Sequence, residues 1–148
     1  MEAIHILLLE DDGATSDLVR RLLARALGTD THTVTTVRLL ADARQRIGPE
    51  YDVVLSDLNL PDSRGLATFH ALHDVAQDVP IVVFSGLNDR QLALDAIHLG
   101  AADFYLKDQL QGETLARALL FAIVRGKADR ARESSKATDV FGRLRELI

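Results

Sequence analysis

A chain of 148 residues is long enough to fold as one domain around a single core, and 47% of its residues are apolar. It contains no cysteine, which excludes disulfides and cysteine-based metal or redox chemistry. Its longest apolar runs are far shorter than the roughly 20 residues of a membrane span, and its first residues do not resemble a signal peptide, so we expect a cytoplasmic protein without a membrane partner.

The net charge of −5 is unevenly distributed along the chain. Residues 125–148 carry seven Lys or Arg and four Asp or Glu, whereas residues 1–124 carry ten and eighteen. An acidic body repels the phosphates of nucleic acids, so we expect no nucleic-acid partner. The charges of the C-terminal stretch are mixed in sign, which is typical of a solvated helix face.

Short apolar or β-branched runs alternate with stretches that have apolar residues at helical spacing. In chain order, the predicted strands and helices are 4–9, 18–27, 31–37, 39–47, 53–55, 66–76, 81–84, 92–99, 102–106 and 115–124. Most of these strands are apolar along their whole length, which is typical of a parallel sheet covered by helices on both faces. The fold class is therefore α/β.

The apolar pattern ends near residue 124. We predict a domain over residues 1–124 and a helical linker or extension over 125–148. Residues 126–138 contain no large apolar side chain, so we expect this stretch to bridge solvent rather than to pack on a core. Apolar residues then return at helical spacing and predict a second amphipathic element, at Val140, Phe141, Leu144, Leu147 and Ile148.

Chemically reactive side chains end four of the five predicted strands. They are Glu10, Asp11 and Asp12 after the first strand, Asp57 after the third, Ser85 after the fourth and Lys107 after the fifth. In an open parallel sheet, ligands bind outside the carboxyl ends of the strands. Crowded carboxylates raise one another's pKa unless a cation lies among them, and a ligand set of oxygens without His or Cys suits Mg²⁺.

The chemistry that fits these residues is phosphoryl transfer to a carboxylate. Asp57 can attack phosphorus and form an acyl phosphate, while Lys107 and a metal ion neutralise the transferred charge and Ser85 donates a hydrogen bond. Each residue alone has an ordinary interpretation as a solvated acid, a surface lysine or a turn. Their joint occurrence at the ends of separate strands favours one shared site.

Four segments in this order resemble the receiver domain of response regulators in two-component signalling. They are LLEDD at 8–12, SDLNLPD at 56–62 followed by Gly65, FSG at 84–86, and GAADFYLK at 100–107. The resemblance covers about residues 4–124. It implies a flavodoxin-like, doubly wound, five-stranded parallel sheet of strand order 2-1-3-4-5, followed by an extended C-terminal helix. The sequence after Lys107 resembles receivers that precede an output module.

The resemblance also assigns roles to individual residues. Asp57 would be the phosphoacceptor, which also binds Mg²⁺. The other Mg²⁺ ligands would be Asp11 directly, Glu10 through water and the backbone carbonyl of Asn59. Ser85 and Lys107 would be the hydroxyl and the lysine that bind the phosphoryl group, and Phe104 the aromatic switch. It implies Mg²⁺ as cofactor and a sensor histidine kinase or phosphotransfer protein as partner. We expect a switch with slow self-dephosphorylation at most, and not an enzyme.

Two departures from the family pattern affect these expectations. Asp108 follows Lys107 where the family usually has a proline in a cis peptide bond. A trans bond is expected here, and with it a differently shaped loop and a less rigidly placed lysine. The switch position holds Phe104 rather than tyrosine, which removes a hydroxyl that could hold the inward conformation.

A second hypothesis is a phosphorylation-independent interaction domain. Such a domain could form a homodimer through the predicted elements 92–99, 102–106 and 115–124, or through the C-terminal helix. The missing proline supports it, and the complete set of acids opposes it, since a scaffold gains nothing from crowded carboxylates.

Two minor motifs have simpler interpretations. His70 and His73 are interpreted as a surface pair rather than as metal ligands. Phe69 and Phe121 fit apolar helix faces and are predicted to lie in the core.

Overall fold

The computed structural model describes residues 3–86 and 89–146, with side chains described as far as residue 132. Strands and helices alternate in the order β1 (Ile4–Leu9), α1 (Gly13–Leu27), β2 (His32–Val37), α2 (Leu40–Arg46), β3 (Val53–Asp57), α3 (Leu66–Ala76), β6 (Ile81–Ser85), α4 (Arg90–His98), β7 (Asp103–Leu106) and α5 (Gly112–Glu146). Every element predicted in the body is present. Among the elements that the structure describes in full, three short ones were not predicted, β4 (Asn59–Leu60), β5 (Ser63–Arg64) and the 3₁₀ helix η2 (Lys107–Gln109). Segments of two or three residues are too short to show a periodicity.

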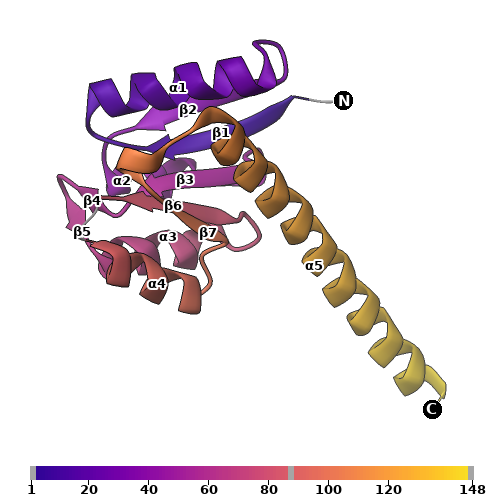
Figure 1. Ribbon diagram of the computed structural model, residues 1–148. Coiled ribbons are helices and arrows are strands. Elements are labelled where there is room, and N and C mark those ends of the chain that lie inside the picture. Colours follow the sequence, from indigo (N-terminus) through magenta and orange to yellow (C-terminus); the bar gives the residue numbers. More distant parts are fainter. Residues whose placement is uncertain (1–2, 87–88, 147–148) are drawn as a thin grey trace.

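The five long strands form one parallel sheet in the order β2-β1-β3-β6-β7. Counting these strands alone, the order is 2-1-3-4-5, so the predicted doubly wound fold is confirmed. Helices α1 and α5 cover one face of the sheet, and α2, α3 and α4 cover the other (Figure 1). The strands β4 and β5 pair separately as a small antiparallel hairpin after β3.

Alternate residues of the central strands supply two separate cores. In β1, Leu7 and Leu9 belong to the cluster under α2, α3 and α4, whereas Ile6 and Leu8 belong to the cluster under α1 and α5. All four are fully buried. Because both faces of the sheet are covered, a central strand must be apolar at successive positions, which explains the continuous apolar runs in the sequence.

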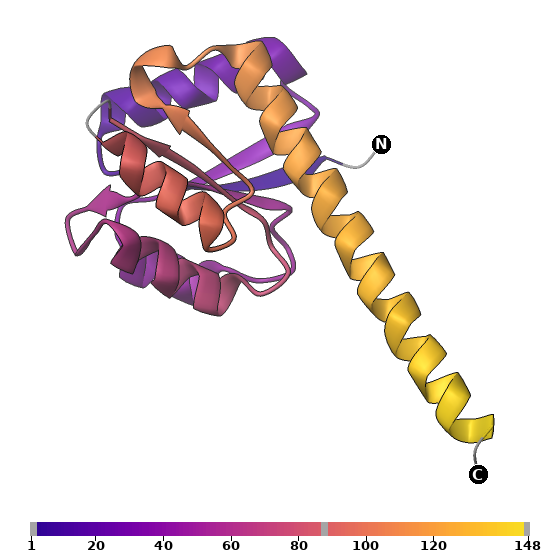
Figure 2. The ribbon, with the colours of Figure 1, turned by 60° about the horizontal axis from the view of Figure 1, so that its bottom comes forward.

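Helix α5 is one continuous helix of 35 residues. The predicted helix 115–124 and the predicted extension thus form a single element, which projects away from the sheet in both views (Figures 1 and 2). The expectation that the stretch from residue 126 only bridges solvent is wrong at its start, where Gly126 lies against Pro80 and Arg130 donates a hydrogen bond to the carbonyl of Asp78. The predicted apolar stripe at 140–148 lies outside the described side chains.

The structure also tests the minor motifs of the sequence. Phe69 is fully buried as predicted, but Phe121 is 59% exposed, so its assignment to the core is wrong. His70 and His73 are both exposed, which confirms the surface pair. Among the described residues, no helix combines the length and the apolar character that crossing a membrane requires.

Candidate functional site

The carboxyl ends of four strands bring the predicted site residues together. The register pairs Leu9 of β1 with Ser56 of β3, the neighbour of Asp57. It pairs Asp57 with Phe84 of β6, and Ser85 with Leu106 of β7. Glu10, Asp57, Ser85 and Lys107 therefore lie side by side along one edge of the sheet, as the sequence predicted.

Lys107 connects the two buried acids of this edge. Its Nζ lies 2.6 Å from Oδ2 of Asp57 and 2.9 Å from Oε2 of Glu10. It also lies 5.3 Å from the ring centroid of Phe84. The described residues contain no cis peptide bond, as expected for an Asp after this lysine. Two ion pairs hold the lysine and η2 shapes the loop after it, while the expected looser placement of the lysine stays a prediction.

Burial and charge pairing change the pKa values of the site in different directions. Burial raises the pKa of Glu10, and this effect outweighs the hydrogen bonds that Glu10 accepts from Lys107 and from the N–H of Asp12. Burial alone would lower the pKa of Lys107, but its hydrogen bonds to Asp57 and Glu10 raise it above the ordinary value. The lysine is therefore a permanent cation between two carboxylates near neutral pH.

Three carboxylates converge where the sequence predicted a metal site. Glu10, Asp11 and Asp57 each offer an oxygen, and these oxygens lie within 4.8 Å of one another. Asp11 is exposed, whereas Glu10 and Asp57 are only 1% and 4% exposed. The remaining acid, Asp12, caps α1 by accepting hydrogen bonds from the N–H and hydroxyl of Thr15, and these bonds lower its pKa.

Ser85 carries an unpaired hydroxyl beside this cluster. The residue is fully buried, and its Oγ has no hydrogen-bond partner among the described residues. Buried hydroxyls nearly always have a partner, and leaving one unpaired costs about 1–3 kcal/mol. An unpaired hydroxyl at the carboxyl end of the strands is available to donate a hydrogen bond to a group that binds there.

The hairpin after β3 fixes the other side of Asp57. The backbone N–H of Asn59 donates to Oδ1 of Asp57 at 3.0 Å, while its side-chain amide donates to Asp89 at the start of α4 at 3.1 Å. Thr68 holds the hairpin by donating to the carbonyl of Leu58 at 2.9 Å. Both carboxylate oxygens of Asp57 are thus oriented, one by Asn59 and the other by Lys107. The predicted metal-binding role of the Asn59 carbonyl stays a prediction.

Phe104 lies on β7, opposite Val83 of β6. Its ring is half-buried and packs against the core under α3 and α4. This position joins the site edge to α4, although the switch role itself stays a prediction.

Sequence reasoning missed two acids that organise the loops around the site. Asp62 in the hairpin accepts hydrogen bonds from the N–H groups of Leu40 at 2.8 Å and Ala41 at 3.0 Å, which begin α2. Asp89 accepts the hydrogen bond from Asn59. Asp62 follows a proline in a turn, where a capping acid is common, but its partner lies 22 residues away and leaves no local signal.

With this geometry established, comparison with known proteins decides the family. A sequence model of the response regulator receiver domain matches residues 6–119. The chain belongs to this family. Receiver domains of response regulators are the phospho-accepting components of two-component signal transduction, which is the general function of this chain.

Two transcriptional regulators match this receiver domain over about half of their own length. The cell cycle transcriptional regulator CtrA of Caulobacter vibrioides is 29% identical over 139 residues, which are 93% of this chain and 57% of that protein. The transcriptional regulatory protein KdpE of Staphylococcus aureus is 35% identical over 113 residues, 76% of this chain and 47% of that protein. The chain thus spans about half the length of these relatives.

Solved structures agree with the fold. Full-length FixJ from B. japonicum superposes with a TM-score of 0.73 at 26% identity, covering 97% of this chain and 68% of that one. A response regulator receiver domain protein from Clostridium thermocellum gives a TM-score of 0.73 at 20% identity, covering 84% of this chain and 98% of that one.

Proposed function

We propose that the chain is a phosphorylation switch in which Asp57 accepts a phosphoryl group from a histidine kinase or a phosphotransfer protein. One observation carries the proposal. Asp57 is 4% exposed and oriented by Lys107 and the N–H of Asn59, with the unpaired hydroxyl of Ser85 on the neighbouring strand. A structural acid would not require a cation on one oxygen, a donor on the other and a free hydroxyl beside it.

The transfer exchanges one bond to phosphorus for another. A carboxylate oxygen of Asp57 forms an O–P bond while the N–P bond of a phosphohistidine breaks, and the imidazole nitrogen keeps the electron pair and takes a proton from water. Lys107 remains beside the new acyl phosphate and balances part of its charge. The hydroxyl of Ser85 then donates to a phosphoryl oxygen and gains the partner that it lacks.

The residues present fit a Mg²⁺ ion. Glu10, Asp11 and Asp57 offer hard oxygen ligands within 4.8 Å of one another, and the exposure of Asp11 leaves room for water ligands. The backbone carbonyl of Asn59 is the proposed further ligand. Bound Mg²⁺ would neutralise the crowded carboxylates and the charge of the incoming phosphoryl group.

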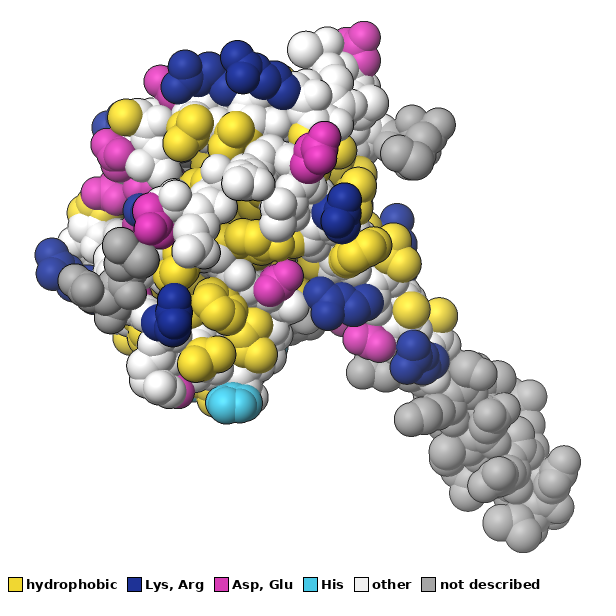
Figure 3. Space-filling view, viewed as in Figure 1, with side chains coloured by type: hydrophobic (Ala, Val, Ile, Leu, Met, Phe, Trp, Pro, Cys, Tyr) yellow, Lys and Arg dark blue, Asp and Glu magenta, His cyan; other side chains and the backbone are white. Residues whose placement is uncertain are grey.

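The phosphorylated state is relayed from Ser85 and Phe104 toward α4, β7 and α5. Large apolar side chains are exposed on these helices, among them Leu94 of α4, which is 40% exposed, and Val124 of α5, which is 63% exposed. Figure 3 shows hydrophobic side chains on this side of the molecule. We propose this face, or α5 itself, as the surface for a homodimer or an output partner.

Slow turnover is part of the proposal. Aspartyl-phosphate hydrolases carry a second acid at the position of Asn59, and an amide cannot replace it as a general acid. The chain therefore acts as an acceptor with at most slow self-dephosphorylation, and not as an enzyme. The cytoplasmic location and the lack of a nucleic-acid partner stay predictions from composition.

Intact mass after incubation with acetyl phosphate and Mg²⁺ tests the switch. We expect a gain of about 80 Da, the mass of one phosphoryl group. The gain should vanish in Asp57→Asn and in a metal-free sample. A folded wild-type chain that gains no mass would contradict the proposal and favour the phosphorylation-independent interaction domain, which would bind its partner equally well without Mg²⁺.

A further inference from the structure

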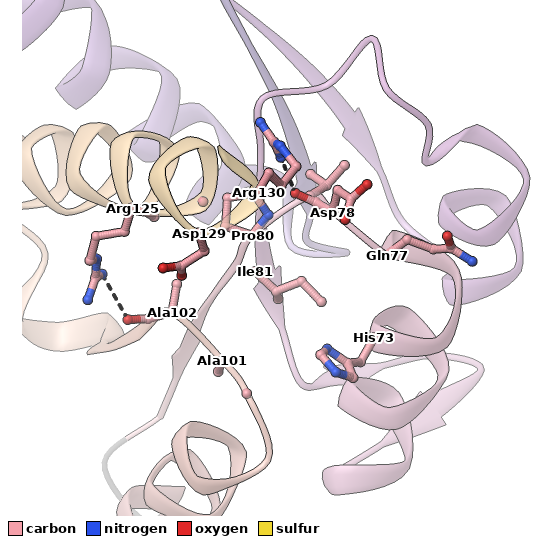
Figure 4. Close-up of a pocket in the computed structure, with 14 residues that line it drawn as sticks. His73, Gln77, Asp78, Pro80, Ile81, Ala101, Ala102, Arg125, Asp129 and Arg130 are labelled. Atoms are coloured by element: carbon pink, nitrogen blue, oxygen red, sulfur yellow. Dashed lines mark hydrogen bonds between the residues drawn. The ribbon is translucent and has the colours of Figure 1, made fainter. Parts of the chain in front are cut away.

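Two arginines attach α5 to the edge of the sheet opposite the phosphoacceptor site. Nη2 of Arg125 donates to the carbonyl of Ala102 at 3.1 Å, and Nη1 of Arg130 donates to the carbonyl of Asp78 at 2.5 Å. Figure 4 shows both contacts on the two sides of one pocket. The partners lie 23 and 52 residues away in sequence, so these contacts join α5 to distant parts of the chain.

Both carbonyls lie at the amino ends of strands that lead to site residues, Asp78 three residues before β6 and Ala102 directly before β7. Asp78 precedes β6, which ends at Ser85, and Ala102 precedes β7, which is followed by Lys107. Both strands are hydrogen-bonded within the sheet, and β6 is buried throughout. Close-packed interiors are hardly compressible and transmit strain, so a displacement at the site end of such a strand reaches its other end.

Between the two arginines, α5 is not packed tightly on the body. A hollow of about 330 Å³ separates them, with Val79, Ile81 and Ala101 on the side of the body and Ala122 and Asp129 on the side of the helix. Gly126 faces Pro80 without a side chain, and an added Cβ would lie 3.6 Å from the proline ring. Beyond residue 124, the hydrogen bonds that hold α5 to the body are therefore those of Arg125 and Arg130 among the described residues.

We propose that Arg125 and Arg130 form a clamp that couples the positions of β6 and β7 to the direction of α5. The proposal rests on the proposed function, because a phosphoryl group on Asp57 supplies the displacement by binding Ser85 and Lys107. The clamp residues are positioning residues, which act through the strands and touch no phosphoryl group. Since coupling is reciprocal, the orientation of α5 also affects the equilibrium between the two states of the site.

Spin labels across the clamp test this inference directly. The chain has no cysteine, so Asp74→Cys on α3 and Ala131→Cys on α5, both exposed, give two unique labelling positions. The label-to-label distance is measured in the full chain with Arg125→Ala and Arg130→Ala combined. Arg132→Ala is the matched control, because the Arg132 side chain is 74% exposed and contacts only Asp129, at 4.0 Å, among the described ion pairs.

We expect a narrow distance distribution in the labelled parent and in the control, and a broader, longer one in the clamp variant. After incubation with acetyl phosphate and Mg²⁺ and rapid freezing, the distribution should shift in the parent and the control. This shift should be lost in the clamp variant, although intact mass shows Asp57 phosphorylated to the same extent. Circular dichroism confirms that each variant is folded.

The possible failures are distinguishable. A clamp variant with the parent's distribution and the parent's shift would overturn the clamp. A phosphorylated parent without a shift would overturn the coupling. A parent that gains no phosphoryl mass would overturn the proposed function and the coupling with it, while the unphosphorylated comparison still decides whether the arginines hold the helix.

Discussion

Two buried serines at the phosphoacceptor site differ in the pairing of their hydroxyls. The hydroxyl of Ser56 donates to the backbone carbonyl of Asp57 at 2.7 Å, whereas the hydroxyl of Ser85 has no partner among the described residues. Both residues are fully buried. A buried hydroxyl stabilises a fold only when it is paired, so these two serines should respond to the same substitution in opposite ways.

We expect Ser56→Ala to lower the free energy of unfolding by about 1 kcal/mol, because a hydrogen bond is lost. Ser85→Ala should leave the free energy of unfolding unchanged or raise it by up to about 1 kcal/mol, because an unsatisfied group is removed. Urea unfolding followed by circular dichroism, without phosphodonor, measures both. A loss of about 1 kcal/mol or more in Ser85→Ala would show that its hydroxyl is already paired.

At the scale of elements, Asp62 connects the β4–β5 hairpin to α2. Burial alone would raise its pKa, but the N–H groups of Ala41 and Leu40 donate to its carboxylate and lower the pKa below the ordinary value of 3.8. A depressed pKa means that the folded state binds fewer protons than the unfolded chain. The stabilisation is then present above about pH 4 and is lost as the pH falls through the folded-state pKa.

Asp62→Ala should therefore lower the free energy of unfolding by about 1 kcal/mol at pH 7, the usual cost of losing a helix cap. The difference from wild type should shrink below pH 3.8, because the wild-type carboxyl becomes protonated there. Urea unfolding at several pH values measures this difference. Asp17→Ala, at an exposed acid of α1, is the control. A difference that does not depend on pH would show that the charge of Asp62 contributes nothing to the cap.

Two glycines of α5 have opposite surroundings. A Cβ on Gly112 would lie 2.8 Å from the backbone oxygen of Leu22 in α1, whereas a Cβ on Gly126 would meet Pro80 at 3.6 Å, an ordinary contact. Gly112→Ala should destabilise the chain by about 1–3 kcal/mol, because α1 and α5 must move apart. Gly126→Ala should stabilise it by about 0.5–1 kcal/mol, because alanine favours the helix. Thermal unfolding compares the two, and equal effects would contradict the contacts described.

At the scale of the whole molecule, the sequence predicted the sheet, and the reactive residues that meet at its edge, for a physical reason. Central strands such as β1 are apolar on both faces, and reactive residues at their ends must meet at one edge. Phe121 could not be placed in this way, because residues 118–124 of α5 are apolar on nearly every side of the helix. The contacts of Asp62 and Arg130 depend on side chains that reach distant backbone groups, and no local pattern encodes such contacts.

Repulsion among the site carboxylates also affects the free energy of unfolding of the whole chain. Glu10, Asp11 and Asp57 are brought within 4.8 Å only by folding, so a cation that neutralises them binds the folded chain and not the unfolded one. Mg²⁺ should therefore raise the midpoint of thermal unfolding. Once its concentration exceeds the dissociation constant, each tenfold increase should add about 1.4 kcal/mol to the free energy of unfolding.

Adjacent acids provide the matched test of this linkage. Asp11→Asn should abolish most of the stabilisation by Mg²⁺, since it removes a charged ligand. Asp12→Asn should retain it, because Asp12 caps α1 and asparagine caps a helix equally well. Calorimetry of the three chains in a Mg²⁺ series, with ionic strength held constant by KCl, separates binding from general screening. An equal response of both variants would mean that Mg²⁺ acts on the overall negative charge rather than at this site.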